Sequence, residues 1–244
     1  MGIAQKLNRP PYAHNWVRYV KGSELETRKA LVAFARSMPQ ITYKAGNQII
    51  QDRVLLQLDR DTAMKVAQQK GRPNSRANVA EYVSAFFDYD LSAGISSRPA
   101  FDEVVEPFRV GKGVVVPVKP LVTTLEAGEF QPIFSVGWAS NPLSTWQHRL
   151  LATIFEDAVF SLADFRRSHG RFLTFPRREK RNPDSRYCEM WQRGDFELLS
   201  RTELRDTLEL YLEALQNAKL QLVAEEIPVR PSSGDREVDH PRLL

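Results

Sequence analysis

Hydrophobic residues recur at the spacing of an α-helix in three long stretches, residues 24–38, 143–167 and 201–224. A hydrophobic residue every three or four positions turns one face of a helix toward the protein core. The stretch 143–167 is apolar over so much of its circumference that it predicts a helix buried between other elements. Ser23 and Ser200 each precede a glutamate by three residues, the pattern of a capping box at a helix start. The sequence therefore predicts a helix near the N-terminus and two long helices later in the chain.

Residues typical of β-strands occupy most of the region between these helices. Residues 113–125 and 130–139 flank a Glu-Ala-Gly-Glu turn, and together they predict a hairpin. Proline residues in both runs indicate an edge position or a bulge, because proline cannot donate a backbone hydrogen bond. Residues 171–175 and 187–192 predict two further strands, and residues 41–58 predict one or two short ones.

The strands and helices do not alternate as a doubly wound parallel sheet requires, so the pattern predicts an α+β fold. We expect a small, mainly helical N-terminal part and a larger antiparallel sheet with two long helices on one face. The predicted divisions are an irregular basic arm at 1–22, a mainly helical subdomain at 23–98, an α+β domain at 99–227 and a flexible tail at 228–244. Within the arm, Tyr12, Trp16 and Tyr19 can anchor the chain.

Composition limits the class of protein. A chain of 244 residues, with 42% hydrophobic and 26% charged residues, resembles ordinary globular proteins. A single cysteine, Cys188, excludes an internal disulfide framework and is typical of a reducing compartment. The chain has no apolar run long enough to span a bilayer, and its first 21 residues lack the apolar core of a secretory signal. These features predict a cytoplasmic protein without a membrane partner.

Charge is distributed unevenly over the C-terminal third. Residues 166–193, the basic segment, carry nine basic and three acidic residues, whereas residues 195–226 carry eight acidic and three basic ones. Phe172, Phe175, Tyr187 and Trp191 interleave with the arginines. Because a guanidinium group binds phosphate oxygens and exposed aromatic rings stack on bases, this segment predicts contact with DNA or RNA. The alternative interpretation is that the aromatic residues are core residues and the arginines pair with the acidic helix after Asp195.

A second basic position lies around Gly71. A short apolar run, a short helix, a glycine turn and a second helix follow one another in the order of a ribbon-helix-helix or helix-turn-helix unit. Two helices joined by a glycine turn are also common scaffolding. Together, the two regions give the following predicted nucleic-acid-binding residues: Arg166, Arg167, Arg171, Arg177, Arg178, Lys180, Arg181, Arg186, Trp191, Lys70, Arg72 and Arg76.

Acidic residues on the helix 143–167 offer a different chemistry. Glu156, Asp157 and Asp164 are spaced so that a regular helix would place carboxylates on one face, where they could bind Mg²⁺ for phosphodiester hydrolysis. The usual interpretation of such carboxylates is a solvated polar face. Four histidines and one cysteine show no zinc-ligand spacing, and no nucleophile or phosphate-loop motif occurs. We therefore expect no metal and no cofactor.

The function predicted from the sequence is a non-enzymatic nucleic-acid-binding protein of prokaryotic type, acting as a regulator or as a subunit of a nucleoprotein complex. The first alternative is an assembly subunit without nucleic acid, whose helix 201–224 packs on a protein partner or on a second copy of the chain. The second alternative is a magnesium-dependent nuclease.

Overall fold

Helices and a mixed β-sheet make up the computed structural model, which describes residues 2–37, 43–70, 73–102, 104–179, 182 and 185–226. The α-helices are α1 (Ala13–Trp16), α2 (Glu24–Arg36), α3 (Lys44–Leu56), α4 (Arg60–Gln69), α5 (Arg76–Ala93), α6 (Thr145–Phe155) and α7 (Arg201–Glu226). The strands are β1 (Ala100–Phe101), β2 (Glu106–Gly111), β3 (Val114–Val118), β4 (Val122–Glu126), β5 (Glu129–Val136), β6 (Arg171–Thr174) and β7 (Glu189–Gln192). Short helical turns are η1 (Ile3–Asn8), η2 (Val17–Tyr19), η3 (Pro73–Ser75), η4 (Glu156–Phe160) and η5 (Ala163–Phe165).

The main sheet has five strands in the order β1-β4-β5-β6-β7, and β2 and β3 form a separate antiparallel ribbon. The α+β class is confirmed. One detail differs from the prediction: β5 and β6 are parallel, so the sheet is mixed rather than wholly antiparallel. Parallel neighbours need a long crossover, and the stretch that contains α6 supplies it.

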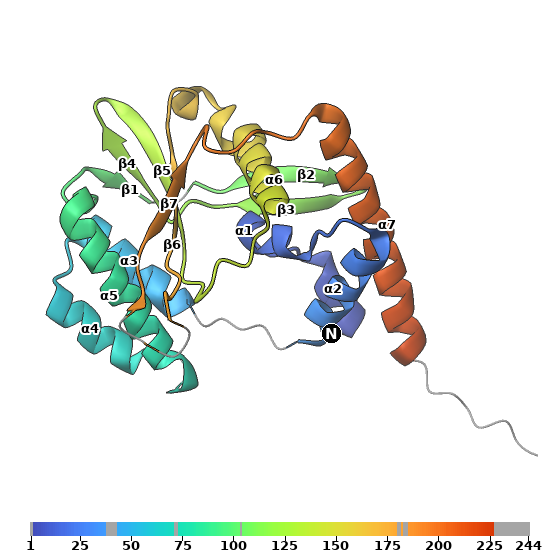
Figure 1. Cartoon of the computed structure of the whole chain (residues 1–244), viewed down its shortest axis with the longest axis horizontal. Coiled ribbons are helices and arrows are strands. Elements are labelled where there is room, and N and C mark those ends of the chain that lie inside the picture. The colour runs from blue at the N-terminus through green and yellow to red at the C-terminus, as the bar shows by residue number, and fades with distance from the viewer. Residues whose placement is uncertain are drawn as a thin grey trace, which may run out of the picture.

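Helices cover both faces of this sheet (Figure 1). Alternate residues of a strand point to opposite faces. Phe134 and Phe172 accordingly belong to a core that contains α6, the N-terminal turns and α7, whereas Ile133 and Leu173 belong to a core with α3 and α5. The sheet therefore separates two groups of helices.

Of the two long helices predicted to share a face of the main sheet, only α6 lies on it, stacking Phe155 on Phe134 with ring centroids 3.9 Å apart. The last helix, α7, packs instead on α2, η1 and the β2–β3 ribbon. Its buried Tyr211 ring meets the edge of Trp16 with centroids 4.8 Å apart. Most of the apolar stripe of α7 is thus buried against the N-terminal part of the chain and the β2–β3 ribbon.

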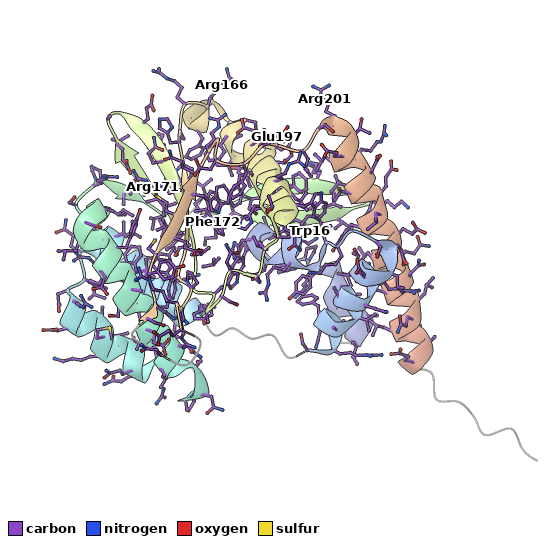
Figure 2. All side chains as sticks on the ribbon, viewed as in Figure 1. Trp16, Arg166, Arg171, Phe172, Glu197 and Arg201 are labelled. Atoms are coloured by element: carbon purple, nitrogen blue, oxygen red, sulfur yellow. The ribbon has the colours of Figure 1, made fainter. Side chains whose placement is uncertain are left out.

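Residues 2–22 belong to the stretch predicted as an irregular arm, but they form η1, α1 and η2 and place Leu7, Trp16, Val17 and Val20 in the core. The side-chain amide of Gln147 on α6 donates hydrogen bonds to the carbonyls of Val17 and Val20, at 2.9 and 3.0 Å. Figure 2 shows Trp16 and Phe172 inside the molecule, with Arg166 and Arg201 at its outer edge.

Some local predictions are confirmed in the structure, and others are wrong. The predicted capping box forms at Ser200: the Glu203 backbone N–H donates to the Ser200 hydroxyl at 3.2 Å, and the Ser200 backbone N–H donates to the Glu203 carboxylate at 2.7 Å. At Ser23 only half of the box forms: the Glu26 backbone N–H donates to the Ser23 hydroxyl at 3.3 Å, and the Glu26 carboxylate accepts a hydrogen bond from that hydroxyl. The predicted strands at residues 41–58 are wrong, because most of this stretch is α3. Residues 113–125 divide between β3 and β4, and the helix predicted at 143–167 gives way to a π-helical turn after Phe155.

The predicted tail at 228–244 lies outside the described residues. In the part of the chain that is described, no helix is both long enough and apolar enough to cross a lipid bilayer.

Candidate nucleic-acid interface

A cleft of about 940 Å³ lies between the N-terminal turns and α3. Its floor is formed by residues 135–140 at the carboxyl end of β5 and by residues 119–121, which precede β4. Because β5 and β6 are parallel and connected by a helix, this floor corresponds to the crevice at the carboxyl ends of parallel strands, a common ligand position in open sheets. The sheet topology thus determines where the cleft lies.

One wall of the cleft is a polar face of α3. Its lining side chains follow helical spacing and are Tyr43, Lys44, Asn47, Gln48, Gln51 and Leu55. Gln51 also donates a hydrogen bond from its amide to the carbonyl of Leu121 at 2.7 Å, which ties this wall to the floor. The opposite face of α3 carries Ile49, Ile50 and Val54 into the core. The helix is held by its apolar face and presents amides and a lysine to the cleft.

The other wall comes from the N-terminal turns and consists largely of aromatic rings. Tyr12 stacks on His14 with ring centroids 6.1 Å apart, and His14 meets the edge of Trp138 at 6.2 Å. The guanidinium of Arg18 lies over the Trp138 ring, 5.3 Å from its centroid. Tyr12 is the outer member of this ladder and remains 43% exposed. The wall offers an open aromatic face beside a fixed cation.

Positive charge predominates among the described residues of the cleft. Arg18, Lys44 and Lys119 are its cations and Asp102 is its carboxylate. Burial, reinforced by the charge of Arg18, lowers the pKa of His14 to about 4, so its imidazole is neutral at physiological pH. The cleft therefore carries an excess of positive charge suited to an anionic ligand.

Behind the floor, a buried polar group holds the α3 wall against the sheet. The hydroxyl of Tyr82 on α5 bonds to the side chains of Asn47 at 3.0 Å and Ser135 at 2.6 Å. Burial raises the pKa of Tyr82 well above its usual value, which keeps the phenol protonated. Since Asn47 and Ser135 line the cleft from different elements, this bond fixes their relative positions.

Arg186, a cation of the basic segment, is buried behind the cleft wall. The Arg186 side chain is 1% exposed and donates hydrogen bonds to Glu81, to the carbonyls of Gly137 and Phe175, and to the hydroxyl of Tyr43. With its donors engaged inside the protein, Arg186 supports Tyr43 and Gly137 in the cleft wall instead of facing solvent.

Other arginines of the basic segment are also paired with carboxylates. Arg177 binds Glu81 through its Nε at 2.9 Å and also contacts Asn78. Arg171 makes a two-pronged ion pair with Glu126 at 2.9 and 2.8 Å. The alternative interpretation is that these arginines pair with the acidic helix after Asp195. It is wrong for Arg171 and Arg177, because their partners lie on β4 and α5.

The remaining residues predicted to bind nucleic acid lie in separate parts of the structure. Arg166 and Arg178 are exposed, and Arg178 lies over the Tyr187 ring at 4.9 Å. Arg167 is 85% exposed and pairs with Glu129 at 3.2 Å. Trp191 is an interior ring, 5.0 Å from Phe172 between centroids. Lys70 is exposed and Arg76 half-buried, while Lys180, Arg181 and Arg72 lie outside the described residues.

The structure does not gather the predicted acidic residues into a metal site. Glu156 pairs with Arg193, whose Nε lies 2.8 Å from its carboxylate. Asp157 and Asp164 are exposed, and the π-helical turn ends the regular spacing that would have aligned them. Among the described residues, no three His, Cys, Asp or Glu side chains are placed to hold one ion.

Sequence reasoning misses most of the cleft, although it singles out Tyr12 as an anchor. Lys44 and Lys119 are isolated cations separated by 75 positions, so no local charge density marks them. The signal that is present is the short run Tyr12-Ala-His-Asn-Trp-Val-Arg18, which combines aromatic, amide and cationic side chains.

Comparison of the chain with protein-family models, with curated proteins and with solved structures finds no match. The candidate site therefore rests on the geometry of the described residues alone.

Proposed function

We propose that this protein binds nucleic acid in the cleft, contacting the phosphate backbone through Arg18, Lys44 and Lys119. The observation that carries the proposal is the joint presence of these cations, the exposed ring of Tyr12 and the amides of α3 around one concave surface. Phosphate neutralisation supplies affinity for nucleic acid, and aromatic rings and amides contact bases. A regulator or a subunit of a nucleoprotein complex would use such a surface without catalysis.

The cleft supports the proposal better than the basic segment does. An arginine that already makes a buried ion pair would have to abandon its carboxylate before it could bind phosphate, and the carboxylate would then be left without its partner. The cleft is a concavity that a ligand can enter, and cations, aromatic rings and amides line its walls, with Lys119 also held by an interaction within the protein. The predicted function is retained, while its proposed contacts move from the segment to the cleft.

Fluorescence anisotropy with labelled single- and double-stranded DNA and RNA at ~50 mM salt tests this function, since phosphate contacts are strongest at low salt. We compare Lys44→Glu/Lys119→Glu with Arg166→Glu/Arg167→Glu, which changes the net charge equally on another surface. We expect the first pair to abolish binding and the second to leave most of it. If the second pair alone abolishes binding, the interface is the exposed edge near Arg166. If the unmodified protein binds none of the four probes, the function is rejected.

A second candidate is assembly through α7, which one observation favours. Leu220 and Val223 are exposed, at 62% and 48%, and they line a groove of about 360 Å³ between α7 and the β2–β3 ribbon together with Val114 and Leu212. An apolar surface of this kind suits a protein partner or a second copy of the chain. Leu220→Glu/Val223→Glu should lower the mass measured by light scattering if the protein is a dimer through α7. An unchanged mass rejects the dimer.

A further inference from the structure

The shape of the cleft indicates whether a single strand or a duplex would bind there. This inference rests on the function proposed above. Proteins usually read a duplex by inserting a convex element, a helix or a two-stranded ribbon, into one of its grooves. Here the polar side chains converge on a concave site of about 940 Å³, near the upper end of the range for enclosed ligand pockets. A concave site of this kind suits a few unpaired nucleotides better than the convex surface of a duplex.

The aromatic wall is arranged to extend a stack outward. Tyr12, His14 and Trp138 form a ladder that begins in the core, where Trp138 is 6.3 Å from Phe172 between ring centroids. Arg18 lies against the same Trp138 ring. The outermost ring, Tyr12, stacks on His14 while 43% of the residue stays exposed. A base that stacks on Tyr12 would continue the ladder, with the guanidinium of Arg18 close to its phosphate.

The opposite wall supplies groups that can contact the edge of such a base. The amide oxygen of Asn47 is oriented by Tyr82, and the amide nitrogen of Gln51 is oriented by the carbonyl of Leu121. Each amide has a second polar atom of the other type, a donor on Asn47 and an acceptor on Gln51. In a single strand the Watson–Crick edges are unpaired and can bond to side-chain amides, whereas in a duplex they are occupied.

We infer that the cleft binds single-stranded nucleic acid, with one unpaired base stacked on Tyr12 and facing the amides of α3. Arg18, Lys44 and Lys119 hold the flanking phosphates. The stacking contact is tolerant of base identity, because every base has an aromatic face.

This inference is tested by removing the Tyr12 ring from the protein, one base from the oligonucleotide, and then both together. The probes are a labelled ten-nucleotide oligothymidylate, its uridylate counterpart, the same oligonucleotides with one abasic position moved along the strand, and a hairpin duplex of equal charge. Tyr12→Ala is compared with Tyr12→Trp, which restores a larger ring. Thermal unfolding of each variant confirms that the fold is retained.

We expect the single strand to bind at least tenfold more tightly than the hairpin. Tyr12→Ala should weaken single-strand binding about 5- to 150-fold without changing its salt dependence, since a stacking contact releases no counterions. Tyr12→Trp should restore binding. One abasic position should weaken binding to the unmodified protein but have no further effect on Tyr12→Ala. The deoxy and ribo probes decide which backbone the cleft prefers.

Two outcomes separate this inference from the function on which it rests. If the hairpin binds as tightly as the single strand and Tyr12→Ala has no effect, while Lys44→Glu/Lys119→Glu abolishes binding, the cleft binds phosphate but takes no stacked base. The inference is then overturned and the proposed function stands. If no probe binds the unmodified protein, both are overturned.

Discussion

Positive charge is used differently in the basic segment and in the cleft. In the segment, Arg171, Arg177 and Arg186 point inward and bind Glu126 and Glu81. In the cleft, Arg18, Lys44 and Lys119 come from three distant parts of the chain and surround an open concavity. A high density of charged residues along the sequence therefore does not imply a high density of charge on the protein surface. Arginine suits the inward role because its planar fork binds a carboxylate through two parallel bonds.

The two regions are nevertheless connected through Arg186. Its guanidinium lies over the Tyr43 ring at 5.6 Å and bonds to the Tyr43 hydroxyl, and another of its nitrogens bonds to the carbonyl of Gly137. Both residues line the cleft. The basic segment thus acts as the support of the cleft wall, and the following predictions test this division of roles, beginning with the largest effect.

Replacing Arg186 with alanine should destabilise the protein most. The change leaves Glu81 with Arg177 as its ion-pair partner, but it removes the donor for the buried carbonyls of Gly137 and Phe175, and each buried group left without its hydrogen bond costs about 1–3 kcal/mol of unfolding free energy. Urea unfolding measures the loss. Arg166→Ala is the matched control, because Arg166 is exposed, and should change stability by less than about 0.5 kcal/mol. Equal effects in the two variants would show that Arg186 has no special structural role.

Gly137→Ala should damage the cleft directly. A Cβ atom at this position would lie 2.5 Å from Cδ1 of Tyr43, so the ring would have to move into the cleft. Overpacking of this kind costs about 1–3 kcal/mol, and the displaced ring should also weaken ligand binding. Gly22→Ala is the control, since a Cβ there meets nothing within 4 Å. Unchanged binding by Gly137→Ala would mean that Tyr43 does not shape the binding surface.

Acid should weaken the fold through His14. Its pKa is about 4 in the folded protein, whereas the ordinary pKa of a solvated histidine is 6.5, so between these values the unfolded chain binds more protons. The unfolding free energy should therefore fall as the pH is lowered from 6.5 to about 4, by about 1–3 kcal/mol. His14→Phe should remove this part of the pH dependence in urea unfolding curves. If the variant and the parent show the same slope, His14 does not cause this pH dependence.

Arg167→Ala should have the smallest effect on stability. The Arg167 side chain is 85% exposed and its pair with Glu129 lies in solvent, where such pairs contribute about 0–1 kcal/mol. We expect a change within about 0.5 kcal/mol in urea unfolding, decreasing further in high salt. A loss comparable to that of Arg186→Ala would contradict the contrast between exposed and buried arginines of the segment.

The sequence predicts those parts of the fold that depend on local patterns. The helix that begins after Ser200 has both a capping box and a long apolar repeat, and both reflect contacts within a few turns of the chain. The hairpin of β4 and β5 follows from its strand residues and its glycine turn. By contrast, Ile49, Ile50 and Val54 are β-branched and favour a strand, although in the structure they form the buried stripe of α3.

The candidate site depends on tertiary contacts that no local pattern encodes. A run of arginines has the same appearance in sequence whether its partners are phosphates or carboxylates. Here the partners of Arg177 and Arg186 include Glu81, about one hundred positions away in the chain. The cleft likewise combines residues from the N-terminal turns, α3 and the end of β5. Only the folded topology brings those segments together.

The packing of the N-terminal turns against α7 has a consequence for synthesis. Trp16 contacts Tyr211 as well as Phe108, so its ring is fully enclosed only when α7 has been made, 195 positions later in the chain. At about 5–20 residues per second, that interval is roughly 10–40 s. During this time the side of Trp16 that Tyr211 covers stays open on the nascent chain, where a chaperone can shield it. We therefore expect a chain that lacks α7 to expose the surface of the N-terminal turns that α7 covers in the complete fold.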